Sequence, residues 1–476
     1  MIQRLQILLL ALLLGAGSLP AQELVSIESK GSRALWQLQL LYGDFIQYGI
    51  DMYKVTYTTP DAFGALDTAS GLLVVPILEE ESALPLLVYQ HGTVTGPSDV
   101  PSNLQGGWEL AAITGGMGYA SLAPDYLGLG ESRGFHPYVH AATEASAGLD
   151  MIRAVRSYAP EMDLYLNEQL FLTGYSQGGH ASMALHRSLE LDHSDEFTVT
   201  AASHLSGPYS ISGTMRDLIL SDEAYGYVAY LPNTILSYHT VYGLYEGLDA
   251  FFKPDYLAPI EQYFNREISL FSLNIQLINQ LTNDYGSAIT KGMLQDSIIT
   301  ILTDEPDHPI NQALRDNDVY EWAPQQPTRI FYCEGDDQVP YRNSVVADSV
   351  MQLLGAADLV TMNLNSTFDH GECVEPAMLQ TIIFFGQYQE ITVNTPELSA
   401  EASVRLFPNP VDDLLTIKDL PVAATAQLFD LQGRPVLRQA LAAGTVQLKL
   451  DQLPAGIYLL RLEGEGFRNS QRIIVE

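Results

Sequence analysis

The feature that most constrains the fold is an alternation of short apolar, β-prone runs with segments of helical periodicity. The strand-like runs include LPLLVYQHGT, GYASLAPDYLGLGES, QLFLTGYS and TRIFYCEGDD, and the helical segments include TEASAGLDMIRAVRSYA and ASMALHRSLE. Strands that alternate with helices pair in parallel, in a sheet covered on both faces. We therefore expect an α/β fold with a mostly parallel, doubly wound sheet and a ligand site beyond the carboxyl ends of its strands.

One junction between a strand and a helix carries a serine between glycines, in the order Gly174-Tyr175-Ser176-Gln177-Gly178. Glycine permits the close backbone approach that a sharp turn requires. Such a turn lifts the serine hydroxyl clear of the sheet, and Gly-x-Ser-x-Gly on a strand, turn and helix is typical of a nucleophilic serine. Ser176 is therefore the candidate nucleophile.

A serine hydroxyl needs a base to take its proton, and histidine suits because its pKa lies near neutrality. The expected chain order is serine, acid, histidine. Of the ten histidines only His370, in TFDHGECVEP, lies beyond the pair Asp336-Asp337, so His370 is the predicted base. The two adjacent carboxylates cannot both point at His370, and either one can be the acid. A structural role is expected for three other histidines, His91, His180 and His204.

A tetrahedral intermediate requires hydrogen-bond donors aimed at its oxyanion. The predicted donors are two backbone N–H groups, one from Gln177, directly after the nucleophile, and one from Thr93, in the loop after His91-Gly92.

The chain has two cysteines, placed symmetrically about the predicted acid and base. Cys333 lies three residues before Asp336, and Cys373 lies three residues after His370. One expectation is a disulfide that ties the two loops together, which an exported protein can form. Two buried free thiols are the alternative.

The N-terminal segment MIQRLQILLLALLLGAGSLPAQ combines a basic residue, an apolar run and small residues. It predicts a secretory signal peptide over residues 1–21, with a membrane anchor as the alternative. No later stretch of the sequence reads as a transmembrane segment.

The rest of the chain divides by pattern. We expect a catalytic domain over 22–390, a helical insertion at about 210–325 that caps the strand ends, a linker over 391–403, and a small all-β sandwich over 404–476. The net charge of −34 lies entirely before residue 404, because residues 404–476 hold eight basic and eight acidic residues. An acidic surface repels nucleic acid, which excludes that class of partner.

Six motifs in order, YQHGT, APDYLGLGES, HPYVHAATEASAGLDMIRA, GYSQGGHASM, YCEGDDQVPYRNS and DHGEC, resemble the α/β-hydrolase superfamily. Within it the chain is similar to secretory lipases and esterases with a helical lid. The resemblance implies hydrolysis of carboxylic esters through an acyl-enzyme, without a metal or organic cofactor. It favours Asp336 as the acid, since the family aspartate usually lies four residues before the proline of Val-Pro, here Pro340. Asp336 follows Gly335 directly, whereas the family usually places two residues between them, so Asp337 stays an alternative.

The motifs LFPNP, LFDLQGRPV, LPAGIYLLRLEG and QRIIVE resemble the C-terminal sorting domain of the type IX secretion system. This resemblance implies the secretion machinery as a partner, export across the outer membrane, and a secreted or surface-attached enzyme.

The leading hypothesis is a secreted serine hydrolase that cleaves lipid-like or other apolar acyl esters. Three alternatives are a serine peptidase of the same fold, an esterase for acyl-carbohydrate or feruloyl-type esters, and a surface binding protein on an inactive hydrolase fold. The peptidase is less favoured because such enzymes usually carry an N-terminal propeller, and about 60 residues precede the hydrolase core here. The surface binding protein is less favoured because the nucleophile, the acid and the base all have candidate residues.

Overall fold

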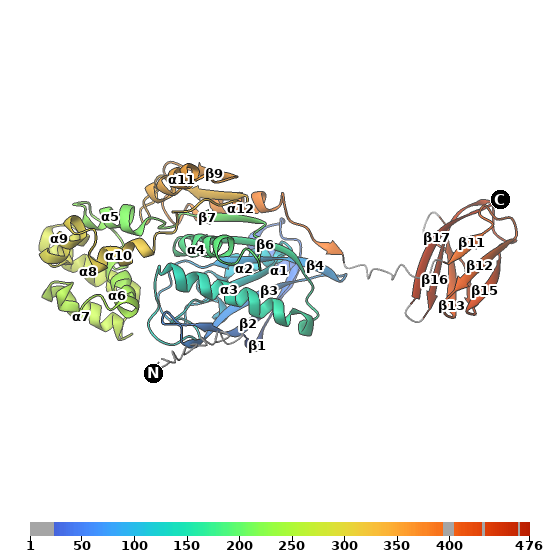
Figure 1. Ribbon diagram of the computed structural model, residues 1–476, viewed down its shortest axis with the longest axis horizontal. Coiled ribbons are helices and arrows are strands. Elements are labelled where there is room, and N and C mark those ends of the chain that lie inside the picture. Colours follow the sequence, from blue (N-terminus) through green and yellow to red (C-terminus); the bar gives the residue numbers. More distant parts are fainter. Residues whose placement is uncertain (1–22, 394–403, 431–433, 465–466) are drawn as a thin grey trace, which may run out of the picture. The chain divides into compact units, whose positions relative to one another are not determined.

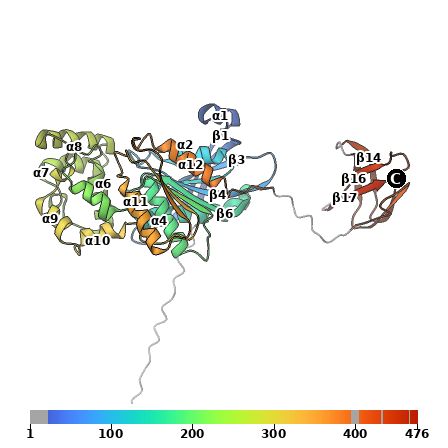
Figure 2. The ribbon, with the colours of Figure 1, turned by 90° about the horizontal axis from the view of Figure 1, so that it is seen from above.

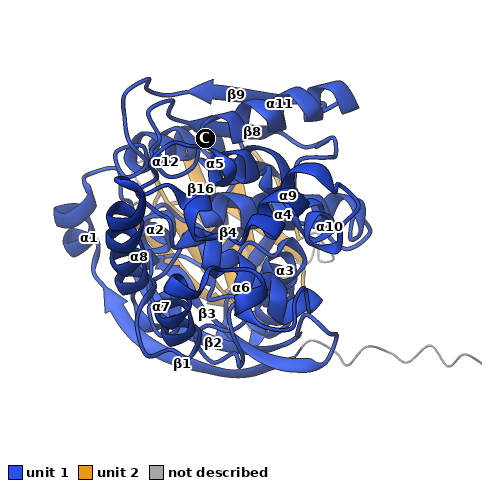
Figure 3. Cartoon of the chain, turned by 90° about the vertical axis from the view of Figure 1, so that its left-hand side faces the viewer, with its two compact units in different colours: residues 1–392 blue, residues 393–476 orange. Residues whose placement is uncertain are grey.

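The computed structural model describes residues 23–393, 404–430, 434–464 and 467–476. The predicted signal peptide and most of the predicted linker lie outside these described residues. The chain forms two compact units, residues 1–392 and 393–476, which are coloured separately in Figure 3. Among the helices described, none has the length and apolar character needed to span a membrane.

The larger unit is built on a ten-stranded sheet with the order β1-β2-β3-β5-β4-β6-β7-β8-β9, and β10 pairs with β4. The run from β5 to β9 is parallel throughout, whereas β1, β2 and β3 extend the sheet in antiparallel pairing. The predicted mostly parallel sheet is therefore confirmed. The strands are β1 (Leu24–Arg33), β2 (Gly49–Pro60), β3 (Leu66–Ile77), β4 (Ser82–Gln90), β5 (Ala120–Pro124), β6 (Leu166–Tyr175), β7 (Ala201–Leu205), β8 (Thr328–Tyr332), β9 (Leu359–Asn363) and β10 (Thr392–Val393).

Helices cover both faces of this sheet (Figures 1 and 3). Successive strand residues point to opposite faces, and the two faces carry separate cores. Leu172 of β6 packs in one cluster with Ile152 of α3 and Leu185 of α4. Its neighbour Phe171 packs in another with Leu38 of α1 and Phe385 of α12. The helices that cover the sheet are α1 (Leu35–Tyr42), α2 (Trp108–Gly116), α3 (Ala141–Tyr158), α4 (Gln177–Leu191), α11 (Arg342–Leu354) and α12 (Val374–Phe385).

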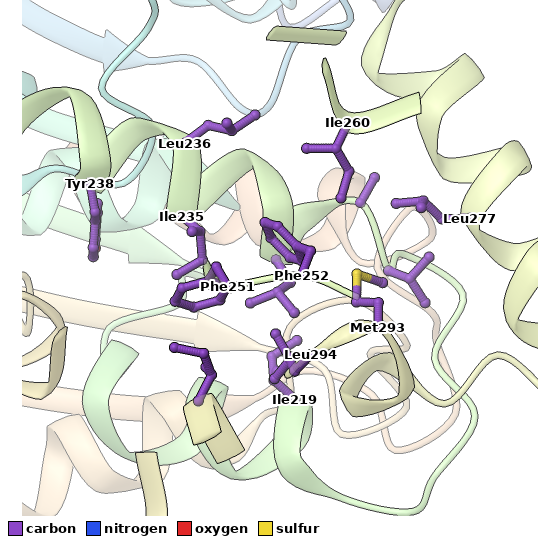
Figure 4. Packing of buried hydrophobic residues seen from close by; sticks show 14 of the residues in the cluster. Ile219, Ile235, Leu236, Tyr238, Phe251, Phe252, Ile260, Leu277, Met293 and Leu294 are labelled. Carbon is purple, nitrogen blue, oxygen red and sulfur yellow. The ribbon is translucent and has the colours of Figure 1, made fainter. Parts of the chain in front are cut away.

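A helical lobe, drawn in green and yellow in Figures 1 and 2, is formed by the part of the chain that follows β7 and precedes β8. Its helices fall in the stretch for which the sequence predicts an insertion, and they are α5 (Arg216–Leu220), α6 (Tyr230–Tyr242), α7 (Pro254–Phe264), α8 (Leu270–Tyr285), α9 (Asp296–Asp304) and α10 (Pro309–Asp316). The lobe has its own apolar core around Phe251, Phe252 and Leu277 (Figure 4). Tyr138 and Val139, from the loop before α3, belong to the same core, so the lobe packs directly on the sheet-containing part of the larger unit.

Short helical turns complete the larger unit, at Pro101–Asn103, Ala159–Met162, Ile211–Met215, Leu248–Ala250 and Thr290–Met293.

The smaller unit consists of two antiparallel sheets, β11-β12-β15 and β14-β13-β16-β17. Alternate residues of its strands point inward, so that Leu415, Ile417, Leu428 and Leu460 are buried together. It forms a separate β domain, as the sequence predicts. Its strands are β11 (Arg405–Phe407), β12 (Leu414–Leu420), β13 (Ala424–Phe429), β14 (Pro435–Leu441), β15 (Gly444–Lys449), β16 (Gly456–Gly464) and β17 (Phe467–Val475).

The core of the helical lobe predicts a contrast between two leucine truncations. Leu277 is fully buried on α8, whereas Leu353 on α11 is 86% exposed. Leu277→Ala should lower the free energy of unfolding by about 2–5 kcal/mol, because it leaves a cavity. Leu353→Ala should change it by less than about 0.5 kcal/mol. All three tryptophans lie in the larger unit, so urea unfolding followed by tryptophan fluorescence reports on that unit alone. Equal losses from the two variants would contradict the assignment of this core.

Candidate active site

The turn between β6 and α4 places Ser176 in a strained backbone conformation, with φ 62° and ψ −124°. A positive φ is costly for a residue that has a Cβ and is characteristic of functional turns. The flanking glycines allow it, because a Cβ at Gly178 would overlap the Gln90 carbonyl and one at Gly174 would overlap the carbonyl of Gly178. The Ser176 N–H donates to the carbonyl of Leu205 at 3.0 Å. The turn is thus held between the ends of three parallel strands, β4, β6 and β7.

The predicted acid and base meet in the loops that follow β8 and precede α12. His370 Nδ1 lies 2.6 Å from Asp336 Oδ2, and both side chains are almost fully buried. The other carboxylate oxygen of Asp336 accepts from the backbone N–H groups of Gln338 at 2.9 Å and Val339 at 2.8 Å. Asp336 is therefore held rigidly and can orient the imidazole so that Nε2 faces away from the carboxylate.

Asp337, the alternative acid, contacts the backbone of His370 and not its ring. Its Oδ1 accepts from the His370 N–H at 3.2 Å, and its Oδ2 accepts from the Tyr227 hydroxyl at 3.4 Å. The two adjacent carboxylates thus hold different parts of the same histidine residue.

Cys333 and Cys373 form a disulfide that joins these two loops. Both cysteines are fully buried and pack with Phe331 and Ala377. Cys333 directly follows β8 and Cys373 directly precedes α12, so the bond ties the start of the Asp336 loop to the end of the His370 loop.

Tyr175 connects the base to the nucleophile turn. It is the residue before Ser176, and its hydroxyl donates to the carbonyl of His370 at 2.5 Å. Its ring lies 4.9 Å from the imidazole, centroid to centroid. Within the described part of the chain no hydrogen bond joins the Ser176 hydroxyl to the His370 ring, so proton transfer between them belongs to the proposal below.

The two residues predicted to supply oxyanion donors lie on either side of Ser176. Gln177 is the first residue of α4, where backbone N–H groups have no acceptor within the helix. The loop after β4 passes close to the nucleophile, since a Cβ on Gly92 would be 3.7 Å from the Ser176 Cβ. Thr93 follows in that loop, and its hydroxyl is 2.9 Å from the Tyr138 hydroxyl.

Two cavities meet at this site. Ser176 lines a narrow, mostly apolar cavity of about 80 Å³ beneath the helical lobe. The walls of this cavity include Ile211, Ile219, Leu231, Ile235, Leu302 and Leu314. A second cavity of about 260 Å³ includes the more polar side chains Asn233, Arg266, Glu267 and Ser269 in its lining. Tyr138 and Gln177 line both cavities, so the two cavities are neighbours, and the second is the less apolar of the two.

Three tyrosines of the helical lobe bind the Asp336 loop. The Tyr225 hydroxyl donates to the Gln338 carbonyl at 2.7 Å, and the Tyr230 hydroxyl donates to the Gln338 side-chain oxygen at 2.9 Å. Tyr227 donates to Asp337, as described above. Burial raises the pKa of Tyr225 and of Tyr230, so both remain protonated donors. The helical lobe is thereby attached to the loop that holds the acid.

No sequence pattern indicated these tyrosines, nor the half-buried His136 and the buried Glu144 that contact the Gln177 side chain. The tyrosines resemble ordinary core residues of the lobe. Glu144 carries a weak signal, because a carboxylate within the apolar face of a helix needs a buried partner.

Residues 405–476 match the family described as secretion system C-terminal sorting domain. No curated protein matches the chain in sequence.

The larger unit is similar to several solved structures. The rice cell wall degrading esterase LipA from Xanthomonas oryzae is 26% identical with a TM-score of 0.69, and the match covers 77% of this chain and 99% of that one. A protein from Legionella pneumophila is 23% identical with a TM-score of 0.68, covering 79% of this chain and 99% of that one. Candida antarctica lipase A in its closed state is 16% identical with a TM-score of 0.56, covering 79% and 84%. The last two show the fold alone.

The larger unit therefore has the α/β-hydrolase fold, and its similarity to the esterase from Xanthomonas oryzae supports a hydrolase of the esterase type. The chain ends in a secretion system C-terminal sorting domain. This domain indicates type IX secretion, with export to the cell surface or beyond.

The disulfide yields a prediction on stability. The two cysteines are separated by 40 residues, and a loop of that length corresponds to about 4 kcal/mol of lost denatured-state entropy in the chain-entropy model. The double variant Cys333→Ala and Cys373→Ala should therefore unfold at lower urea concentration, as followed by tryptophan fluorescence. Alkylation of the exported wild-type protein without reductant should find no free thiol. Two alkylated cysteines in that folded protein would contradict the bond.

Proposed function

We propose that this protein is a secreted serine hydrolase that cleaves carboxylic esters with apolar acyl groups, and that Ser176, His370 and Asp336 are its catalytic triad. The observation that carries the proposal is the strained Ser176 at the mouth of an apolar cavity, on a sheet that also holds the hydrogen-bonded Asp336–His370 pair.

In the proposed reaction His370 Nε2 takes the proton of the Ser176 hydroxyl as Oγ bonds to the ester carbonyl carbon. The carbonyl oxygen becomes an oxyanion that accepts from the backbone N–H groups of Gln177 and Thr93. The C–O bond to the alcohol then breaks, and His370 returns the proton to the leaving oxygen. Water deacylates the serine by the same steps, with His370 as base. Asp336 keeps the Nδ1 proton of His370 in place and stabilises the imidazolium.

The two cavities support an assignment for the two halves of the substrate. The cavity that contains Ser176 is lined mostly by apolar side chains, with Arg216 and Gln177 among the polar exceptions, so burial of an acyl chain there is favourable. The second cavity offers the Arg266 guanidinium, the Glu267 carboxylate and the Asn233 amide. We assign the acyl chain to the first cavity and the alcohol portion to the second.

A second candidate function follows from that polar compartment. Esters of a polar alcohol, such as acyl-carbohydrate or feruloyl-type esters, would place hydrogen-bonding groups against Asn233, Arg266 and Glu267. One structural neighbour is described as a rice cell wall degrading esterase, which supports including such substrates in the first assays.

The first test compares wild-type protein with Ser176→Ala on p-nitrophenyl esters from C2 to C16. We expect the wild type to hydrolyse them, with a chain-length optimum set by the apolar cavity. Ser176→Ala should lose about 10⁶-fold in kcat, because the nucleophile is gone. Aminoacyl nitroanilides serve as the peptidase control and acylated sugars as the polar-alcohol substrates. A folded wild type that is inert on every ester would contradict the proposed function.

A second test distinguishes the two adjacent carboxylates. Asp336→Asn should lower kcat by about 10⁴-fold, because the amide no longer holds the imidazole in the required tautomer. Asp337→Asn should retain most of the activity, since its remaining side-chain oxygen can still accept from the His370 N–H. Steady-state kinetics on one ester measure both. Equal losses, or a larger loss at Asp337, would contradict the assignment of Asp336.

A further inference from the structure

We propose that residues 136–144 form a positioning segment that holds both oxyanion donors, with Glu144 fixing Gln177 and Tyr138 fixing Thr93. This inference rests on the proposed function, in which the backbone N–H groups of Gln177 and Thr93 stabilise the oxyanion. None of the segment's side chains is needed for the proton transfers. Its role is to keep donors in place, which is what makes an oxyanion site effective.

The side-chain amide of Gln177 is held at both of its hydrogens. Gln177 Nε2 donates to Glu144 Oε1 at 2.9 Å, and it lies 2.8 Å from His136 Nε2. His136 Nδ1 donates to the Leu127 carbonyl at 2.8 Å, so its Nε2 is free to accept. Burial lowers the pKa of His136 to about 3, and the ring is therefore the neutral acceptor that this arrangement requires.

Glu144 is itself held from the opposite side. Its Oε2 lies 2.7 Å from His180 Nδ1, and His180 Nε2 lies 2.8 Å from the carbonyl of Asn317. Both ring nitrogens of His180 therefore lie within hydrogen-bond distance of an oxygen atom. Glu144 is 1% exposed and His180 is fully buried. A buried carboxylate is costly to leave unpaired, and each oxygen of Glu144 has a partner, one in His180 and the other in Gln177.

The second donor is held from the same segment. The Tyr138 hydroxyl is 2.9 Å from the Thr93 hydroxyl, and the Tyr138 N–H donates to the hydroxyl of Ser237 on α6 at 3.0 Å. Ser237 in turn donates to the carbonyl of His136 at 2.8 Å. The helical lobe is therefore hydrogen-bonded to the backbone of the segment through Ser237. The side chains of the segment in turn contact both donor residues, Thr93 and Gln177.

The main test is Glu144→Gln, compared with Glu190→Gln as a matched control. Both glutamates bond to a histidine of α4, Glu144 to His180 and Glu190 to His186, but only Glu144 contacts Gln177. A glutamine at position 144 has one accepting oxygen and one donating NH₂ group. That NH₂ group would face either the Gln177 amide or the His180 ring, and one of the two contacts would be lost. We expect kcat to fall about 10-fold, less than the cost of removing a donor outright, with KM changed less than 2-fold. Glu190→Gln should leave kcat unchanged.

The readout that separates positioning from general stability is affinity for a transition-state analogue. An alkyl trifluoromethyl ketone adds to the serine and forms a tetrahedral oxyanion adduct. Its inhibition constant should rise in Glu144→Gln by the same factor by which kcat/KM falls, and it should not change in Glu190→Gln. A loss of thermal stability without this parallel would overturn the proposal.

A double-mutant cycle tests whether Glu144 acts through Gln177. Gln177→Met removes the side-chain amide and keeps the backbone N–H. In that background Glu144→Gln should cause little further loss in kcat, whereas fully additive losses would overturn the proposal.

If Glu144→Gln does not fold, Tyr138→Phe gives the same test at Thr93. We expect a loss in kcat, a parallel rise in the inhibition constant, and additivity with Gln177→Met. An inert, folded wild type would overturn the proposed function and this inference together, whereas an active wild type with an unaffected Glu144→Gln would overturn this inference alone.

Discussion

The close backbone contact at the nucleophile turn is the constraint on which the rest of the site depends. Gly178 lies so near the Gln90 carbonyl that no side chain fits, and Ser176 is bonded to Leu205. The ends of β4, β6 and β7 therefore lie close to Ser176. The strain at Ser176 is of the order of 1–3 kcal/mol, which the packed sheet on either side can sustain. A serine raised in this way has its hydroxyl beyond the sheet edge, where it lines the apolar cavity.

The second requirement is that His370, which is distant in sequence, be held close to that turn. Three independent restraints act on the His370 loop: Asp336 holds the ring, Asp337 holds the backbone N–H, and Tyr175 holds the carbonyl. The disulfide links this loop to the loop of the acids. The tyrosines of the helical lobe then bond to the same acid loop, so the lobe that encloses the apolar cavity also supports the residues proposed for proton transfer.

Much of this arrangement follows from local sequence patterns. The alternation of strands and helices predicts the parallel sheet, and the glycines around Ser176 predict the turn. The order of motifs leaves His370 as the base because it alone follows the acid pair. The choice between Asp336 and Asp337 could not be made from the residues, because neighbouring side chains of a loop have no regular periodicity. Only the fold shows that Asp336 faces the ring while Asp337 faces the backbone.

The sequence by itself determined the elements and the chemistry they can carry: a parallel sheet, a serine at a sharp turn, one available base, and a separate β domain for export. These depend on periodicity, glycine placement and residue type, which act over a few neighbouring positions. The tertiary structure decided which groups meet. The contacts of Glu144 with Gln177, of Tyr138 with Thr93 and of the lobe tyrosines with the acid loop join residues 33 to 113 positions apart. Such contacts depend on how packed helices and loops converge, and no local pattern encodes that.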